Sequence, residues 1–156
     1  MPEVVVEQES VVAAPIERVW ERVVSPAGIN HELGPWLRMG MPRGLAASTI
    51  ESVPIGEPLG RSWIRLLGIV PVDFDDLTIV ELEPGRAFRE ESTMLSARRW
   101  RHERRLDAVP TGHTLVHDRL TFTPRLPGGL AASAQGRVVA ALFAHRHRRL
   151  AAWFPG

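Results

Sequence analysis

The chain has 156 residues, 44% hydrophobic and 24% charged, and its 19 basic residues nearly balance its 18 acidic ones. This length predicts a single domain over residues 1–156, and the near-zero net charge argues against nucleic acid as a partner, because polyanion binders carry a surplus of positive charge on one face. The lack of cysteine excludes thiolate chemistry and disulfides, and no apolar run approaches the roughly 20 residues that a membrane-spanning helix needs, so we expect no stable membrane insertion.

The N-terminal part of the chain predicts one strand and two short helices. Residues 3–13 are rich in valine and indicate a strand, with no basic flank of the kind that precedes a secretion signal, so we expect a cytoplasmic protein. Pro15 suits the first turn of a helix, and the apolar residues of IERVWERVV recur three and four apart, which predicts a helix over 16–24. AGINHEL, over 27–33, predicts a second short helix.

An apolar but irregular segment, PWLRMGMPRGLAAS, occupies residues 35–48. Proline and glycine interrupt it repeatedly, which indicates a loop, yet loops are usually more polar than this one. We therefore expect it either to cover an edge of the core or to form a wall of a binding site.

The rest of the chain predicts a run of strands and then one long helix. Strand-like runs separated by turn signals lie at residues 48–55, 61–69, 75–85, 86–94, 97–109 and 113–125. Their close spacing favours an antiparallel meander over parallel units with crossover helices. After Pro127-Gly128-Gly129 an apolar stripe at helical spacing predicts a long C-terminal helix from residue 130.

Two of the predicted strands carry polar residues on the face that their apolar neighbours assign to the interior. Side chains alternate along a strand, so His102 and Arg104 share the face of Trp100, and Asp118 shares the face of Val116. A buried charge needs a partner, so Asp118 should bond Arg104 or His102. Glu90, one strand earlier, would be another interior acid. These residues either form a structural network that fixes the strand register or orient the polar end of a mostly apolar ligand.

The stretch FAHRHRRLAAWF, residues 143–154, mixes histidine and arginine with apolar residues. On a helix His145 and His147 lie about 200° apart, so they cannot hold one metal ion. We expect Phe143, Leu150 and Phe154 to pack on the sheet and the arginines to face outward near the negative end of the helix dipole. An anionic ligand or a partner surface stays open as an alternative. The chain has no glycine-rich phosphate loop, GxSxG or HExxH motif, so we expect no metal and no cofactor.

Four motifs resemble the START-like helix-grip (SRPBCC) superfamily, whose members include polyketide cyclase/dehydrase and lipid-transport proteins. They are PxxxVW at 15–20, WxHER at 100–104, HDRLTFTPR at 117–125 and FxHRHRRL at 143–150, and they look like a bacterial subgroup. The resemblance implies an α+β fold in which a curved antiparallel sheet wraps around the long C-terminal helix. Two short helices after the first strand would help to close a cavity between them.

This resemblance implies a small hydrophobic ligand, lipid-, polyketide- or terpenoid-like, but it carries over no universal catalytic residue. The tyrosines common in such pockets are absent here. The expected apolar wall comprises Trp36, Met39, Trp63, Phe88, Trp100, Phe122 and Leu142, and the expected polar contacts are Glu90, His102, Arg104 and Asp118. The alternatives are a cyclase or dehydratase that uses His102 and Asp118 as an acid/base pair, and a partner-binding module that uses the arginine-rich helix end. A homodimer stays open.

Overall fold

The computed structural model describes residues 3–42, 44–45 and 48–156. Its elements follow the predicted order of a strand, two short helices, a run of strands and a long helix. They are β1 (Val4–Val12), α1 (Ile16–Val23), α2 (Pro26–Leu33), β2 (Leu37–Met39), the 3-10 turn η1 (Ile50–Ser52), β3 (Pro58–Leu66), β4 (Val70–Glu83), β5 (Ala87–Met94), β6 (Ala97–Ala108), β7 (Thr114–Pro124) and α3 (Gly129–Trp153).

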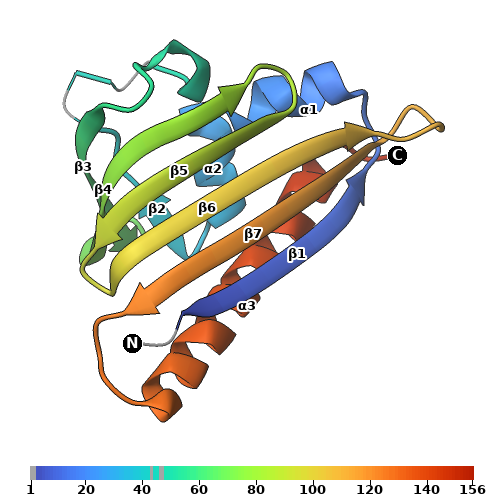
Figure 1. Ribbon diagram of the computed structural model, residues 1–156. Coiled ribbons are helices and arrows are strands. Elements are labelled where there is room, and N and C mark those ends of the chain that lie inside the picture. Colours follow the sequence, from blue (N-terminus) through green and yellow to red (C-terminus); the bar gives the residue numbers. More distant parts are fainter. Residues whose placement is uncertain (1–2, 43, 46–47) are drawn as a thin grey trace.

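The strands form one antiparallel sheet of seven strands in the order β1-β7-β6-β5-β4-β3-β2. Figure 1 shows the sheet curving around α3, with α1 and α2 on the same side of the sheet as α3. The first strand, β1, pairs with the last strand, β7, and forms one edge of the sheet. At the other edge β2 pairs with β3. This α+β arrangement confirms the predicted helix-grip fold.

Local sequence signals explain the two short helices. Pro15 precedes α1, whose buried face consists of Val19, Trp20 and Val23. Ser25 caps α2, because its Oγ accepts a hydrogen bond from the backbone N–H of Gly28 at 3.0 Å. Among the residues that the structure describes, none of the helices is long and apolar enough to cross a bilayer.

The prediction of a strand over 48–55 is wrong, because the chain forms the short turn η1 there. The Ser52 hydroxyl accepts from the backbone N–H of Thr49 at 2.9 Å and donates to the Thr49 carbonyl at 3.0 Å, and such local bonds compete with sheet pairing. The irregular segment expected at 35–48 includes a three-residue strand, β2, and residues 43 and 46–47 of that segment lie outside the described residues.

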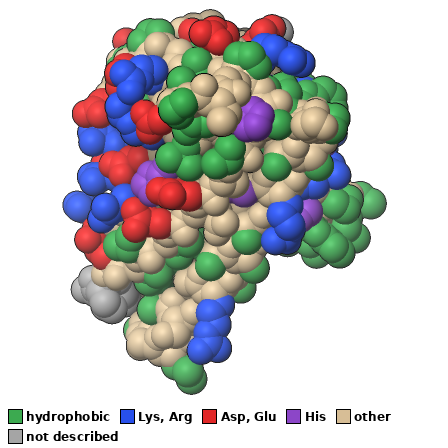
Figure 2. All heavy atoms as spheres, turned by 90° about the vertical axis from the view of Figure 1, so that its right-hand side faces the viewer, with side chains coloured by type: hydrophobic (Ala, Val, Ile, Leu, Met, Phe, Trp, Pro, Cys, Tyr) green, Lys and Arg blue, Asp and Glu red, His purple; other side chains and the backbone are tan. Residues whose placement is uncertain are grey.

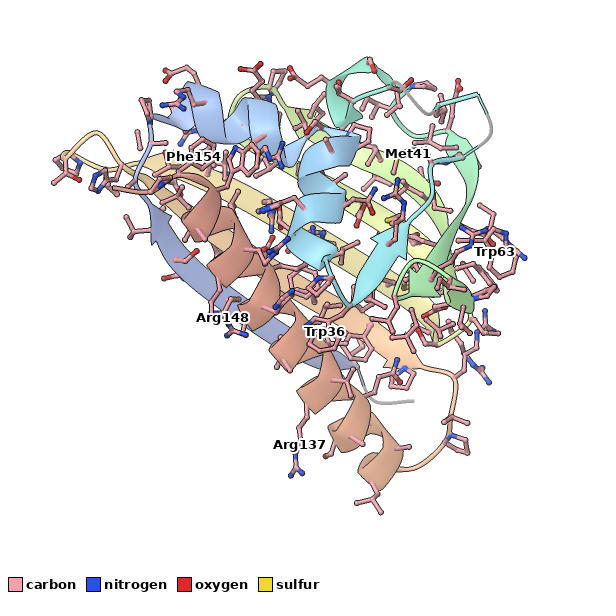
Figure 3. The ribbon with its side chains drawn as sticks, turned by 180° about the vertical axis from the view of Figure 1, so that it is seen from behind. Trp36, Met41, Trp63, Arg137, Arg148 and Phe154 are labelled. Atoms are coloured by element: carbon pink, nitrogen blue, oxygen red, sulfur yellow. The ribbon has the colours of Figure 1, made fainter. Side chains whose placement is uncertain are left out.

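The hydrophobic core divides into two clusters under the sheet. One contains Val12, Val19, Trp20, Val23, Phe88, Leu106, Val116, Leu150 and Phe154; the other contains Met94, Ala97, Leu120, Phe122, Val139 and Phe143. Figure 3 shows Phe154 between α1 and the end of α3. The His102 ring lies between the clusters, with its centroid 5.8 Å from that of Phe88 and 5.1 Å from that of Phe143. The core is thus interrupted by a polar group at mid-sheet.

Candidate functional site

A cavity of about 420 Å³ lies between the concave face of the sheet, α3 and the two short helices. This volume falls in the range of small-molecule sites. Its apolar lining includes Val23, Val24, Ile29, Leu33, Leu37, Met39, Met41, Ile50, Leu59, Ile64, Leu77, Ile79, Phe88, Met94, Trp100, Val138, Val139, Leu142 and Phe143. In Figure 3 the Met41 side chain lies between α2 and β3. The segment after α2 therefore supplies part of the wall, one of the two roles expected for it.

A few polar side chains interrupt this apolar lining. Asp75 on β4, Glu90 on β5 and His102 on β6 come from three adjacent strands, and Arg146 reaches the cavity from α3. Glu90 and His102 are directly paired across the strands, so both point to the concave face. The cavity is therefore apolar over most of its wall, and further polar side chains line it at Ser48, Thr49, Asp73, Ser96 and Gln135.

Asp118 is the centre of a fully buried network behind this polar region. Its Oδ1 accepts hydrogen bonds from His102 Nε2 at 2.7 Å and from Arg104 Nε at 2.8 Å. Its Oδ2 accepts from Arg104 Nη2 and from His147 Nε2, both at 2.7 Å. Burial alone would raise the pKa of Asp118, but the charges of Arg104 and His102 outweigh burial and hold this pKa well below its usual range. Asp118 is therefore a carboxylate that only accepts, and both histidines donate to it.

Arg104 links this carboxylate to a second one on α2. Its Nη1 and Nη2 donate to the two oxygens of Glu32, each at 2.9 Å, and Arg146 Nε donates to Glu32 Oε1 at 3.1 Å. Burial opposes ionisation of Glu32, yet the two arginines lower its pKa. The guanidinium of Arg104 is thus held between two carboxylates, a geometry that a planar fork of donors suits.

His102 connects the network to the cavity. Its Nδ1 lies 3.2 Å from Glu90 Oε1, so both ring nitrogens face carboxylates. Burial lowers the pKa of His102, but Asp118 and Glu90 outweigh burial and raise it above its ordinary value. Protonation lets the ring donate to both carboxylates at once. When protonated, His102 presents its ring at the cavity wall with both N–H groups donating to carboxylates.

Comparison with known families shows to which family the chain belongs. Residues 10–154 match the profile of a family described as a domain of unknown function, DUF8410. The chain belongs to the DUF8410 family. No curated protein sequence matches it significantly.

Solved structures show which fold this DUF8410 domain shares. The Chromobacterium violaceum protein CV1439 aligns with a TM-score of 0.74 at 15% identity, covering 98% of this chain and 99% of that chain. The Zhui aromatase/cyclase from Streptomyces sp. R1128 gives 0.69 at 17% identity, covering 97% and 93%. A START superfamily protein from Mycobacterium smegmatis gives 0.67 at 13% identity, covering 97% of each chain. At these identities the likeness concerns the fold, which is START-like, as the sequence motifs predicted.

The structure brings about half of the predicted site residues together in the DUF8410 cavity. Those that line it are Met39, Phe88, Glu90, Trp100, His102 and Leu142. Arg104, Asp118 and Phe122 face inward as predicted but lie buried behind the lining. Asp118 bonds both His102 and Arg104, whereas the prediction required only one of them.

Two predicted tryptophans lie on the surface. Trp36 is 57% exposed and Trp63 40% exposed, and Figure 3 shows Trp63 on the side of the molecule far from α3. Trp63 points outward because its neighbours Ser62 and Ile64 point inward on β3, and it stacks edge-on with Phe74 on the outer face.

The prediction that the arginines of α3 all face outward is wrong for Arg146. Figure 3 shows Arg137 and Arg148 pointing away from the body of the molecule, but Arg146 is buried against Glu32. His147 is buried too, and its Nδ1 lies 2.6 Å from Ser10 Oγ on β1. Within the described part of the chain no group of three or more potential ligands is arranged to hold a metal ion.

The sequence analysis also missed Asp75, which lines the cavity and is 4% exposed. Burial, reinforced by the charge of Glu90, raises its pKa to about 8. The alternation of Asp75, Leu77 and Ile79 along one face of β4 was a signal that could have placed it inside. Glu32 had no such signal, because a carboxylate on a short helix usually faces water.

Proposed function

We propose that this chain binds a small, largely apolar molecule of the lipid, polyketide or terpenoid kind in the cavity between the sheet and α3. The observation that carries the proposal is the cavity itself, about 420 Å³ in volume, with a mostly apolar wall and a minority of polar groups. A tightly packed core contains few voids larger than a water molecule, so a space of this size favours a binding site over a packing defect. The START-like fold, shared with an aromatase/cyclase, supports ligand binding.

Binding of the neutral fluorescent probe N-phenyl-1-naphthylamine tests this proposal. The probe should bind the purified protein with increased emission, and Leu142→Trp should abolish binding because the larger ring fills part of the cavity. Leu130→Trp is the matched control, since Leu130 lies on the same helix, is 88% exposed and does not line the cavity. Equal binding by the wild type and Leu142→Trp would refute an interior site. Native mass spectrometry would show whether the protein also carries a molecule from its host.

A second candidate function is a cyclase or dehydratase that uses His102 with Asp118. The observation that favours it is that His102 lines the cavity while Asp118 orients the ring through Nε2 at 2.7 Å; Nδ1, now 3.2 Å from Glu90, would have to exchange that contact for the substrate. In that case His102→Ala and Asp118→Asn should lose turnover of a poly-β-ketone thioester while folded protein still binds the naphthylamine probe. Unchanged turnover in both variants would remove this candidate.

A further inference from the structure

One carboxyl oxygen at the cavity has no hydrogen-bond partner among the described residues. Asp75 is 4% exposed, and its Oδ1 makes no hydrogen bond to any residue that the structure describes. The hydroxyls of Ser62 and Ser92, which are buried beside it on β3 and β5, likewise make no hydrogen bond of ordinary geometry among the described residues, although the Ser92 hydroxyl acts on Asp75 and partly offsets the rise of its pKa. Ser62 pairs directly with Asp75 across the strands. Three unpartnered oxygens thus lie together on the concave face, and Asp75 is the one that reaches the cavity.

Such a cluster needs an explanation, because a buried polar atom without a hydrogen bond destabilises the folded protein. The network around Asp118 shows the contrast, since its carboxylate oxygens each accept two hydrogen bonds. A polar group on a molecule in the cavity would satisfy Asp75. Such a group would have to lie beside the oxygen that lacks a partner.

The charges around Asp75 decide which polar group fits. Glu90 on β5 and Asp73 on β4 are acidic, and His102 on β6 and Arg146 on α3 also reach the cavity. Since burial and Glu90 raise the pKa of Asp75 to about 8, its carboxyl is mostly neutral at pH 7 and carries a proton to donate. A ligand carboxylate would be repelled by Glu90, while the cations His102 and Arg146 are already bonded to carboxylates of the protein. An ammonium group would require Asp75 to ionise first. A neutral oxygen that accepts a hydrogen bond meets neither obstacle.

We propose that Asp75, flanked by Ser62 and Ser92, binds the carbonyl oxygen of an otherwise apolar ligand by donating a hydrogen bond to it. A carbonyl oxygen is a group that this site can satisfy by donation alone, because all three side chains can donate, and Glu90 Oε1 already accepts from His102. This assignment rests on the proposed function, since it names the ligand class of the same cavity. It also places the polar contact on β4, away from the His102–Asp118 pair.

The test compares two probes of the same shape, 2-acetylnaphthalene and 2-ethylnaphthalene, each displacing N-phenyl-1-naphthylamine. The ketone should bind about tenfold more tightly, which corresponds to one buried hydrogen bond. Asp75→Leu should reduce ketone affinity to that of the hydrocarbon and leave the hydrocarbon unchanged. Asp75→Asn, whose amide still donates, should keep most of the preference. Asp76→Leu is the matched control, because Asp76 is the next residue, lies on the outer face and pairs with Arg61.

The wild-type protein gives a second readout that needs no variant. The preference for the ketone should decline as pH rises through about 8, because Asp75 then loses the proton that it donates. In Asp75→Asn the preference should not change over the same pH range. The ¹³C shift of a labelled ketone carbonyl should move with the same midpoint.

Three results would overturn the assignment. Equal affinity for ketone and hydrocarbon would show that no donor meets the carbonyl. Tighter binding of 1-(2-naphthyl)ethylamine with rising pH would make the site one for cations. Failure of both naphthalenes and of the fluorescent probe to bind would refute the proposed function itself, a result distinct from binding without a preference for the ketone.

Discussion

Arg104 is the residue on which the buried network depends. It is 1% exposed and donates to Asp118 and Glu32, which are both fully buried. Removing one member of a buried ion pair leaves its partner charged and unsatisfied, which costs more than the pair itself contributes. Burial of a guanidinium is therefore tolerable here because both carboxylates are present.

Arg104→Met should lower the free energy of unfolding by about 3–5 kcal/mol, because Glu32 and Asp118 then lose their shared counter-charge. Urea denaturation at pH 7 measures this change. Arg105→Met is the control: Arg105 is the neighbouring residue on the outer face, 47% exposed at its side chain, and its ion pairs with Glu83 and Asp107 are long, at 3.6 Å. Its loss should cost less than about 1 kcal/mol. Equal losses in the two variants would contradict a special role for the buried pair.

Asp75 makes stability depend on pH in a specific direction. Its pKa is about 8 in the folded chain against an ordinary value of 3.8, so between these values the unfolded chain has released a proton that the folded chain still holds. Stability therefore falls as pH rises through this range, with a slope of up to about 1.4 kcal/mol per pH unit. Urea denaturation from pH 4 to 9 should show a shallower decline for Asp75→Asn. Asp76→Asn should keep the wild-type slope; a shallower slope there too would assign the effect to the strand in general.

The short helices depend on close contact between their backbones. A Cβ added at Gly28 in α2 would lie 1.9 Å from the carbonyl oxygen of Arg22 in α1. The neighbouring residues Val23, Val24 and Ile29 line the cavity, so the contact that joins the two helices also fixes part of its wall. Glycine at position 28 is therefore required by space, since only a hydrogen atom fits there.

Gly28→Ala should separate the helices, lower the free energy of unfolding by roughly 1–3 kcal/mol and weaken binding of N-phenyl-1-naphthylamine. Gly129→Ala is the matched control, because a Cβ at Gly129 meets no atom within 4 Å and alanine favours the helix α3. Thermal unfolding and probe titration measure both variants. A stable Gly28→Ala protein with unchanged probe affinity would show that α1 and α2 can shift without affecting the cavity.

The order of the elements could be predicted from the sequence because turns and side-chain alternation are local properties. β6 and β7 show this best: alternation correctly placed His102, Arg104 and Asp118 on the inner face. The failure at 48–55 is also local, since serine and threonine there bond the backbone of the turn.

The site was harder to predict because burial of a charge depends on its distant partner. Arg146 looks like any solvated arginine until Glu32, more than a hundred residues earlier, is placed beside it. Trp36 and Trp63 show the converse, since size and apolarity suggested the cavity wall and the observed positions put them outside. A large apolar residue is a guide to the interior only when its strand face is known.

At the scale of the whole molecule, the charged side chains on the two sides of the sheet have different surroundings. Figure 2 shows acidic and basic side chains gathered along one side of that view, the side of the outer sheet face. Pairs such as Arg101–Glu91 lie there, exposed to water. On the inner side the charges of the Asp118 network lie close to partners from other elements: Glu32 belongs to α2, Asp118 to β7 and His147 to α3. The inner charges therefore connect parts of the fold that the outer ones do not.

Acid should unfold α2, α3 and the sheet in one transition. The pKa values of Glu32 and Asp118 are lowered in the folded chain, so their stabilising effect is fully present above their ordinary values of 4.5 and 3.8 and is lost as pH falls through the folded values. Far-ultraviolet circular dichroism and tryptophan fluorescence, followed from pH 7 to pH 2, should change at one midpoint.

Glu32→Gln should be less stable at pH 7 and lose less stability on acidification, because this position no longer titrates. Glu81→Gln, at an exposed pair with Arg89, should follow the wild type. Loss of helix signal at a higher pH than the fluorescence change would show instead that α2 and α3 detach while the sheet persists, and that the buried charges hold the helices without joining the fold into one cooperative unit.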